Sequence, residues 1–156
     1  MSERTELSDA DLSETELASA TLLLVDDNQQ NLELMQAWLE PLGCRLEMAH
    51  DGQEAIDLAG RVHPDVVLLD VMMPRMSGFE ACRRLKDAPG TRDVVVIMVT
   101  ALNEVGDFER AVESGCDDFL TKPVNKLELT TRVKSLLRVR LLKRKVEELL
   151  RRQRGG

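Results

Sequence analysis

The chain has 156 residues, of which 43% are hydrophobic, and its formal net charge is −7, which fits one globular domain with extensions. Its longest apolar runs, such as Val94–Val99, are far shorter than the roughly 18 residues of a membrane span. The acidic, polar N-terminus lacks the apolar stretch of a secretory signal, so we expect a cytoplasmic protein without membrane contact. Three cysteines without a CxxC pair indicate neither a disulfide framework nor a zinc site.

Charge is distributed unevenly along the chain. Counting Lys and Arg against Asp and Glu gives −5 for residues 1–20, −10 for 21–131 and +8 for 132–156. Residues 1–20 show no strong hydrophobic period, so we expect an acidic, flexible tail, with a capping pattern at Ser13 and Glu16 that favours only a transient helix. The basic C-terminal segment has neither a DNA-binding motif nor a set of stacking aromatics, so we do not expect nucleic-acid binding.

Five short apolar runs alternate with helical patterns between residues 21 and 131. The runs predict strands at Leu22–Val25, Cys44–Ala49, Val66–Leu69, Val94–Val99 and Asp118–Leu120. Helical spacing predicts helices at 28–42, 52–60, 77–86, 103–113 and 125–153. Several strands are apolar at every position, which is typical of a parallel sheet covered on both faces. The pattern therefore predicts an α/β fold with a doubly wound, five-stranded parallel sheet and a long C-terminal helix.

Polar residues follow the predicted strands where each one ends. Asp26 and Asp27 follow the first, Asp70 the third and Thr100 the fourth, and Lys122 comes shortly after the fifth. The carboxyl ends of parallel strands share one edge of the sheet, which is where ligands bind in such folds. Three carboxylates there repel one another unless a cation is present, and oxygen ligands favour Mg²⁺. With a lysine and a hydroxyl beside them, they indicate a site for a phosphoryl group, which an Asp can accept covalently.

Four segments carry a family resemblance: LLLVDDN from Leu22, VVLLDVMMPRMSG from Val66, VVVIMVTA from Val94 and GCDDFLTKP from Gly115. In this order and spacing the chain resembles a response-regulator receiver domain of two-component signalling over residues 21–138. The resemblance implies the flavodoxin-like strand order 2-1-3-4-5. It also implies a phosphoacceptor signalling domain that catalyses only its own phosphorylation and dephosphorylation, rather than an enzyme acting on another substrate.

The resemblance implies a role for each site residue. Asp70 would take a phosphoryl group from a sensor histidine kinase or a histidine phosphotransfer protein. Mg²⁺ would be held by Asp27 directly, by Asp26 mostly through water, by Asp70 and by the backbone carbonyl of Met72. Lys122 and Thr100 would contact the phosphoryl group, Phe119 would swing inward as the second switch residue, and the Lys122–Pro123 bond would be cis.

Phosphorylation would then alter the face formed by the helix at 103–113, the strand at 118–120 and the helix from 125, which a downstream output protein reads. Phe119 lacks the hydroxyl of the tyrosine that is common in the family, so we expect coupling through packing. Met72 and Leu102 are apolar and stand, by analogy with the family, at positions where its side chains influence attack by water, so we hypothesise slow self-dephosphorylation.

The predicted C-terminal helix continues past the receiver as a basic extension, residues 139–156. Val139, Leu142, Val146 and Leu149 have the 3-4-3 spacing of a coiled-coil seam, which suggests a homodimer or a signalling stalk. Lys and Arg beside the seam oppose a parallel pair by like-charge repulsion. An alternative is a nonphosphorylated scaffold module acting through this helix. A phosphatase of the haloacid-dehalogenase type is disfavoured, because it requires an acid where Met72 stands.

Overall fold

The structure is a computed structural model, and it describes residues 12–101 and 105–155. Five parallel strands form one sheet in the order β2-β1-β3-β4-β5, which confirms the predicted fold class and strand order. The strands are β1 (Thr21–Val25), β2 (Arg45–Ala49), β3 (Val66–Asp70), β4 (Val95–Thr100) and β5 (Asp118–Thr121).

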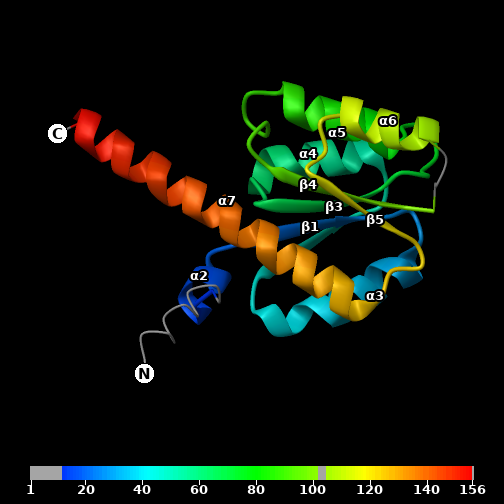
Figure 1. Cartoon of the computed structure of the whole chain (residues 1–156), viewed down its shortest axis with the longest axis horizontal. Coiled ribbons are helices and arrows are strands. Elements are labelled where there is room, and N and C mark those ends of the chain that lie inside the picture. Colours follow the sequence, from blue (N-terminus) through cyan, green and yellow to red (C-terminus); the bar gives the residue numbers. More distant parts are fainter. Residues whose placement is uncertain (1–11, 102–104, 156) are drawn as a thin grey trace.

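Helices cover both faces of the sheet (Figure 1). One face carries α4 (Gly52–Val62), α5 (Gly78–Asp87) and α6 (Val105–Glu113), and the other carries α3 (Gln29–Leu39) and α7 (Lys126–Gly155). A short 3-10 turn, η2 (Glu40–Leu42), follows α3. Strand residues alternate between the two faces, so that Leu23 packs in one core cluster and Leu24 in the other. Both clusters consist of buried aliphatic side chains, as the continuous apolar runs predicted.

The described part of the N-terminal segment differs from the expected flexible tail. Residues Glu14–Ala18 form a short helix, α2, whose first turn has a complete capping box. The Ser13 hydroxyl accepts from the Glu16 backbone N–H at 3.0 Å, and the Glu16 carboxylate accepts from the Ser13 N–H at 2.9 Å. Leu12 and Leu17 pack against the core cluster that also contacts Leu141 of α7. Packing against this core cluster therefore stabilises a helix that the local pattern supports only weakly. The rest of the expected tail, residues 1–11, lies outside the described residues.

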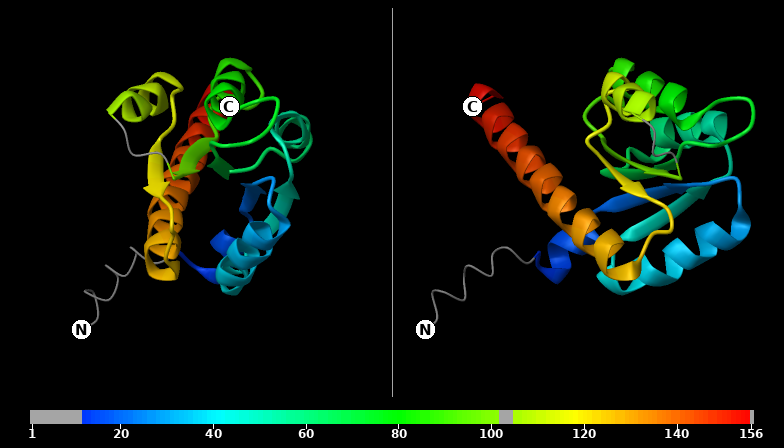
Figure 2. Two further views of the ribbon diagram at one scale, coloured as in Figure 1. Left: turned by 90° about the vertical axis from the view of Figure 1, so that its right-hand side faces the viewer. Right: turned by 45° about the vertical axis from the view of Figure 1, so that its right-hand side comes forward.

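The long helix α7 begins at Lys126, with the Asn125 side chain accepting from the Glu128 N–H at 2.7 Å. Its first three turns bury Leu129, Val133 and Leu137 against the sheet. Beyond them the helix continues to Gly155 and projects away from the sheet (Figure 1; Figure 2, right). The predicted helix at 103–113 agrees with α6 from Val105 onward, its first two residues lying outside the described residues, and the predicted helix at 52–60 continues to Val62.

Candidate functional site

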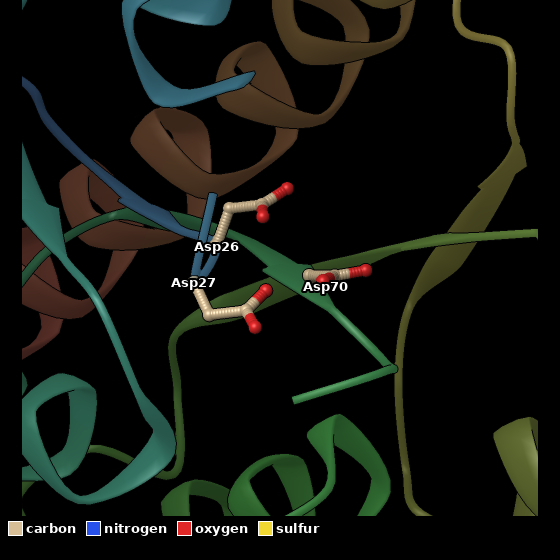
Figure 3. A group of neighbouring side chains, drawn as sticks. All are labelled: Asp26, Asp27 and Asp70. Carbon is tan, nitrogen blue, oxygen red and sulfur yellow. The ribbon is translucent and has the colours of Figure 1, made fainter. Parts of the chain in front are cut away.

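Three carboxylates meet at the carboxyl edge of the sheet (Figure 3). Asp26 and Asp27 follow β1, and Asp70 is the last residue of β3, so two adjacent parallel strands deliver all three. Each offers a carboxylate oxygen within 4.8 Å of the others. Asp26 and Asp70 are almost fully buried, whereas Asp27 is exposed. The structure thus brings together the three acids that the sequence predicted as metal ligands.

Asp26 is held in place by the start of the next helix. Its Oδ1 accepts from the Asn28 backbone N–H at 2.9 Å, and its Oδ2 accepts from the Asn31 Nδ2 at 3.2 Å. Asn28 also caps α3, so the loop that ends β1 both begins the helix and fixes the carboxylate. Sequence reasoning missed Asn31. The available signal was its position in the first turn of α3, four residues after Asp27.

Asp70 lies between the charges of Lys122 and Asp26. Lys122 Nζ lies 3.2 Å from its Oδ1 and 3.7 Å from Asp26 Oδ2. Despite this ion pair, Asp70 Oδ1 is buried and accepts no hydrogen bond with acceptable geometry from the described residues. Burial and the neighbouring charge of Asp26 raise the pKa of Asp70, and they outweigh the opposite effects of Lys122 and of the Met72 backbone. The cluster therefore sets three carboxylates against one nearby lysine and holds excess negative charge.

Lys122 reaches the cluster because β5 ends beside β4. Its backbone N–H donates to the Thr100 carbonyl at 2.7 Å, and the Lys122–Pro123 bond is cis, as predicted. Thr100, the last residue of β4, is buried at the same edge of the sheet. Three neighbouring strands therefore deliver the catalytic residues expected from the sequence. Asp70 ends β3, Thr100 ends β4, and Lys122 directly follows β5.

The loop after Asp70 turns tightly into α5. The Gly78 N–H donates to the Val71 carbonyl at 2.9 Å, and Ser77 caps the helix. A Cβ at position 78 would lie only 2.3 Å from the Asp70 carbonyl oxygen, so no larger residue fits without moving this backbone. Met72, whose carbonyl was expected to bind metal, lies in this loop with its side chain 63% exposed. Leu102 falls outside the described residues.

Phe119 of β5 is half-buried and packs against the core cluster that contains Leu23. Its ring contacts Phe108 of α6 edge to face, with centroids 4.9 Å apart. A small cavity lies between these two rings and Thr100. The two expected switch residues, Thr100 and Phe119, therefore line the same space.

A mostly apolar groove of about 460 Å³ leads to the carboxylates from the α3 side. Its walls are formed by the apolar side chains of α3 and of the segment after β5, namely Leu34, Met35, Trp38, Pro123 and Val124. Its polar end is formed by Asp26, Asn31 and Lys122. A partner bound in this groove would reach the buried cluster directly.

The strand order and the carboxylates beside a lysine at the carboxyl edge define a class of protein, the receiver domain. A family model described as the response regulator receiver domain matches residues 22–134, so the chain belongs to this family and is a receiver domain of two-component response regulators. Among curated proteins, it is 45% identical over 138 residues to the response regulator PleD of Caulobacter vibrioides. That alignment covers 88% of this chain and 30% of PleD, so the chain spans less than a third of this relative.

Solved receiver structures agree with this assignment. The signal receiver domain of a signal transduction histidine kinase from Syntrophus aciditrophicus is 37% identical with a TM-score of 0.71, over 76% of this chain and 89% of that one. The receiver domain of the sensor histidine kinase PA1611 from Pseudomonas aeruginosa PAO1 is 32% identical with a TM-score of 0.70, over 76% and 97%. That structure is described with a magnesium ion coordinated in its active site cleft.

Within residues 12–101 and 105–155, no helix of this chain is long and apolar enough to cross a membrane.

Proposed function

We propose that this receiver is controlled by phosphorylation of Asp70, with Mg²⁺ as cofactor and a sensor histidine kinase or histidine phosphotransfer protein as donor. The observation that carries the proposal is the buried Asp70 carboxylate, which shares its site with two further acids and lies 3.2 Å from Lys122. On this proposal the chain catalyses only its own phosphorylation and dephosphorylation and acts in the cytoplasm, where ATP-dependent kinases operate.

The donor set fits Mg²⁺. All candidate ligands are oxygens, which is the preference of this hard cation, and Asp70 Oδ1 is a buried carboxylate oxygen that has only an ion pair with Lys122, without a well-directed hydrogen bond from the described residues. The carboxylates of Asp26, Asp27 and Asp70, with the carbonyl of Met72, would hold the ion. When bound, the ion offsets the negative charge of the cluster and of an incoming phosphoryl group. The magnesium described in the PA1611 receiver supports the same assignment.

The transfer itself requires little beyond position and charge. A carboxylate oxygen of Asp70 forms a bond to phosphorus while the bond from phosphorus to one imidazole nitrogen of the donor breaks. The electron pair of the broken bond stays on that nitrogen, and because the other ring nitrogen carries a proton, the imidazole leaves neutral. The Lys122 ammonium, already 3.2 Å from Asp70, balances the charge on the phosphoryl oxygens. The apolar groove beside Trp38 gives the donor protein a surface that ends at Asp26 and Lys122.

The small cavity between Thr100, Phe108 and Phe119 gives phosphorylation a way to change the surface that a partner binds. A phosphoryl group on Asp70 attracts the Thr100 hydroxyl, because its oxygens are strong acceptors. Movement of Thr100 enlarges the small cavity that Phe119 already lines, and Phe119 then turns inward and changes the surface of α6, β5 and α7. A downstream output protein reads this surface. Met72, largely exposed and apolar, cannot hydrogen-bond an attacking water, which supports slow dephosphorylation; a phosphoryl lifetime of seconds would contradict that part.

Phosphoryl uptake tests the proposal directly. Purified protein is incubated with acetyl phosphate and Mg²⁺ and analysed on a phosphate-affinity gel. We expect a shifted band for the wild type and for Asp87→Asn, a matched change at an exposed acid of α5, and none for Asp70→Asn. Lys122→Ala should lower the rate by about 10²-fold or more, the usual effect of removing a charge-stabilising group. A shifted band in Asp70→Asn would refute the assignment.

Metal binding has its own readout, because Trp38 is the single tryptophan of the chain and shares the groove with Asp26. Titration with Mg²⁺ should change its fluorescence, and Asp27→Asn should weaken the apparent affinity while leaving the fold intact, since Asp27 is exposed. Equal affinities for the wild type and Asp27→Asn would exclude Asp27 as a ligand.

A further inference from the structure

The projecting part of α7 carries an exposed apolar stripe. Val139, Leu142, Val146 and Leu149 are 44–54% exposed, although each is a large aliphatic side chain. Their 3-4-3 spacing places them along one narrow line on the helix, the width of a coiled-coil seam rather than of a face buried in a globular core. We define these four residues as the outer stripe.

The opposite side of the same helical segment is anchored to the receiver. Arg144 Nη1 donates to Asp65 Oδ1 at 2.8 Å, and Arg140 Nε lies 3.8 Å from the same oxygen. Asp65 is buried where β3 begins, and its Oδ2 accepts from the Thr21 N–H at 3.0 Å. Leu141 adds apolar contact with the core cluster beside α2.

This anchor fixes the direction of the outer stripe. Leu142 is two residues from both Arg140 and Arg144, which is about 200° around an α-helix. Val146 is likewise two residues beyond Arg144. The stripe therefore faces away from the sheet, so a helix can pack along it without contacting the body of the receiver.

The charges beside the stripe select the kind of occupant. Five residues flank it: the basic Arg138, Lys143, Lys145 and Arg152, and the apolar Leu150, which is 49% exposed. Arg152 also pairs with Glu148 within the helix at 3.1 Å, and no acidic residue occupies a flanking position. A second copy in either orientation would place like charges against these residues, which is destabilising. An anionic membrane would suit the charge, but the stripe is narrow and lacks aromatic residues, and Glu147 and Glu148 lie on the polar side of the helix.

We propose that the outer stripe binds an amphipathic helix of another protein whose apolar seam is flanked by Asp or Glu. The apolar seams pack knobs into holes, and the partner's carboxylates pair with Lys143 and Lys145, which lie on opposite sides of the stripe. This inference deepens the proposed output of the receiver, but the surface exists before phosphorylation, so it is testable separately from Asp70.

The test uses two synthetic helical peptides with Leu at the seam positions and either Glu or Lys at all flanking positions. Binding to the full chain is measured by calorimetry, with circular dichroism to verify that each variant stays helical. We expect the Glu peptide to bind, more weakly as salt increases, and the Lys peptide not to bind. The double change Leu142→Gln and Leu149→Gln keeps every charge and should weaken binding at least about tenfold. Lys143→Glu with Lys145→Glu should reverse the preference between the peptides.

Other outcomes would overturn the inference. Equal binding of the Glu peptide to the Leu142→Gln and Leu149→Gln variant would show charge attraction without a docking seam. A doubled mass in light scattering that these changes abolish would identify a second copy as the occupant. Binding to phosphatidylglycerol vesicles but not to the Glu peptide would identify a membrane. Asp70→Asn should bind the Glu peptide like the wild type, because the surface exists before phosphorylation. If the peptide fails to bind while phosphoryl uptake proceeds, this inference fails and the proposed function stands.

Discussion

Replacement of Gly78 by alanine should destabilise the protein through a single atom. The added Cβ would lie 2.3 Å from the Asp70 carbonyl oxygen and 2.8 Å from the Val71 Cα, whereas ordinary contacts measure 3.4–4 Å. The backbone must separate by about 1.1 Å to restore contact distance. Both neighbours are main-chain atoms next to a buried strand, so they cannot move aside as a flexible side chain would.

The expected cost is at the upper end of the range for overpacking, about 3 kcal/mol, which the better helix propensity of alanine offsets by up to about 1 kcal/mol. A net loss of about 2 kcal/mol follows. Gly60→Ala is the matched control, because Gly60 is an exposed residue of α4 with nothing within 4 Å of the added Cβ. It should gain up to about 1 kcal/mol.

Urea denaturation followed through the fluorescence of Trp38 measures both changes. We expect the two variants to differ by about 3 kcal/mol in the free energy of unfolding. Since the displaced carbonyl belongs to Asp70 itself, Gly78→Ala should also slow phosphoryl uptake, by up to about 10²-fold if the carboxylate shifts by 1 Å. If Gly78→Ala is as stable as Gly60→Ala, the steric reasoning is wrong.

Asp65→Ala should lower the free energy of unfolding by about 2–3 kcal/mol, because it leaves two partly buried arginines of α7 and the backbone N–H of Thr21 without their acceptor. Urea titration measures the change, and a loss below about 0.5 kcal/mol would contradict the role of Asp65 as an anchor for α7. Ser13→Ala should destabilise α2 by about 1 kcal/mol, seen as faster amide exchange at Leu17 with unchanged exchange in the sheet. Burial raises the pKa of the Cys82 thiol to about 11, and the neutral form is therefore favoured by folding. Stability should fall as pH rises from 9 to 11, and less steeply in Cys82→Ala.

Much of the fold could be predicted because its determinants are local. The continuous apolar run Val66–Leu69 indicates a strand buried on both faces, and Asp70 directly after it indicates the edge where ligands bind. The predicted strands agree with the structure to within about one residue at each end. The acidic cluster was predictable for the same reason, since parallel strands deliver their last residues to one edge whatever the packing around them.

The sequence alone thus determined the α/β architecture, the residues at the carboxyl edge of the sheet and the seam pattern of the C-terminal helix, because each depends on chain periodicity or on positions within one element. Only the tertiary structure decided how the C-terminal helix is oriented and that α2 forms. Asp65 and Arg144 are 79 residues apart, and their ion pair forms because folding carries α7 across the sheet to the point where β3 begins. Residue spacing along the chain does not encode such a contact, because the contact depends on where two elements that form separately meet in space.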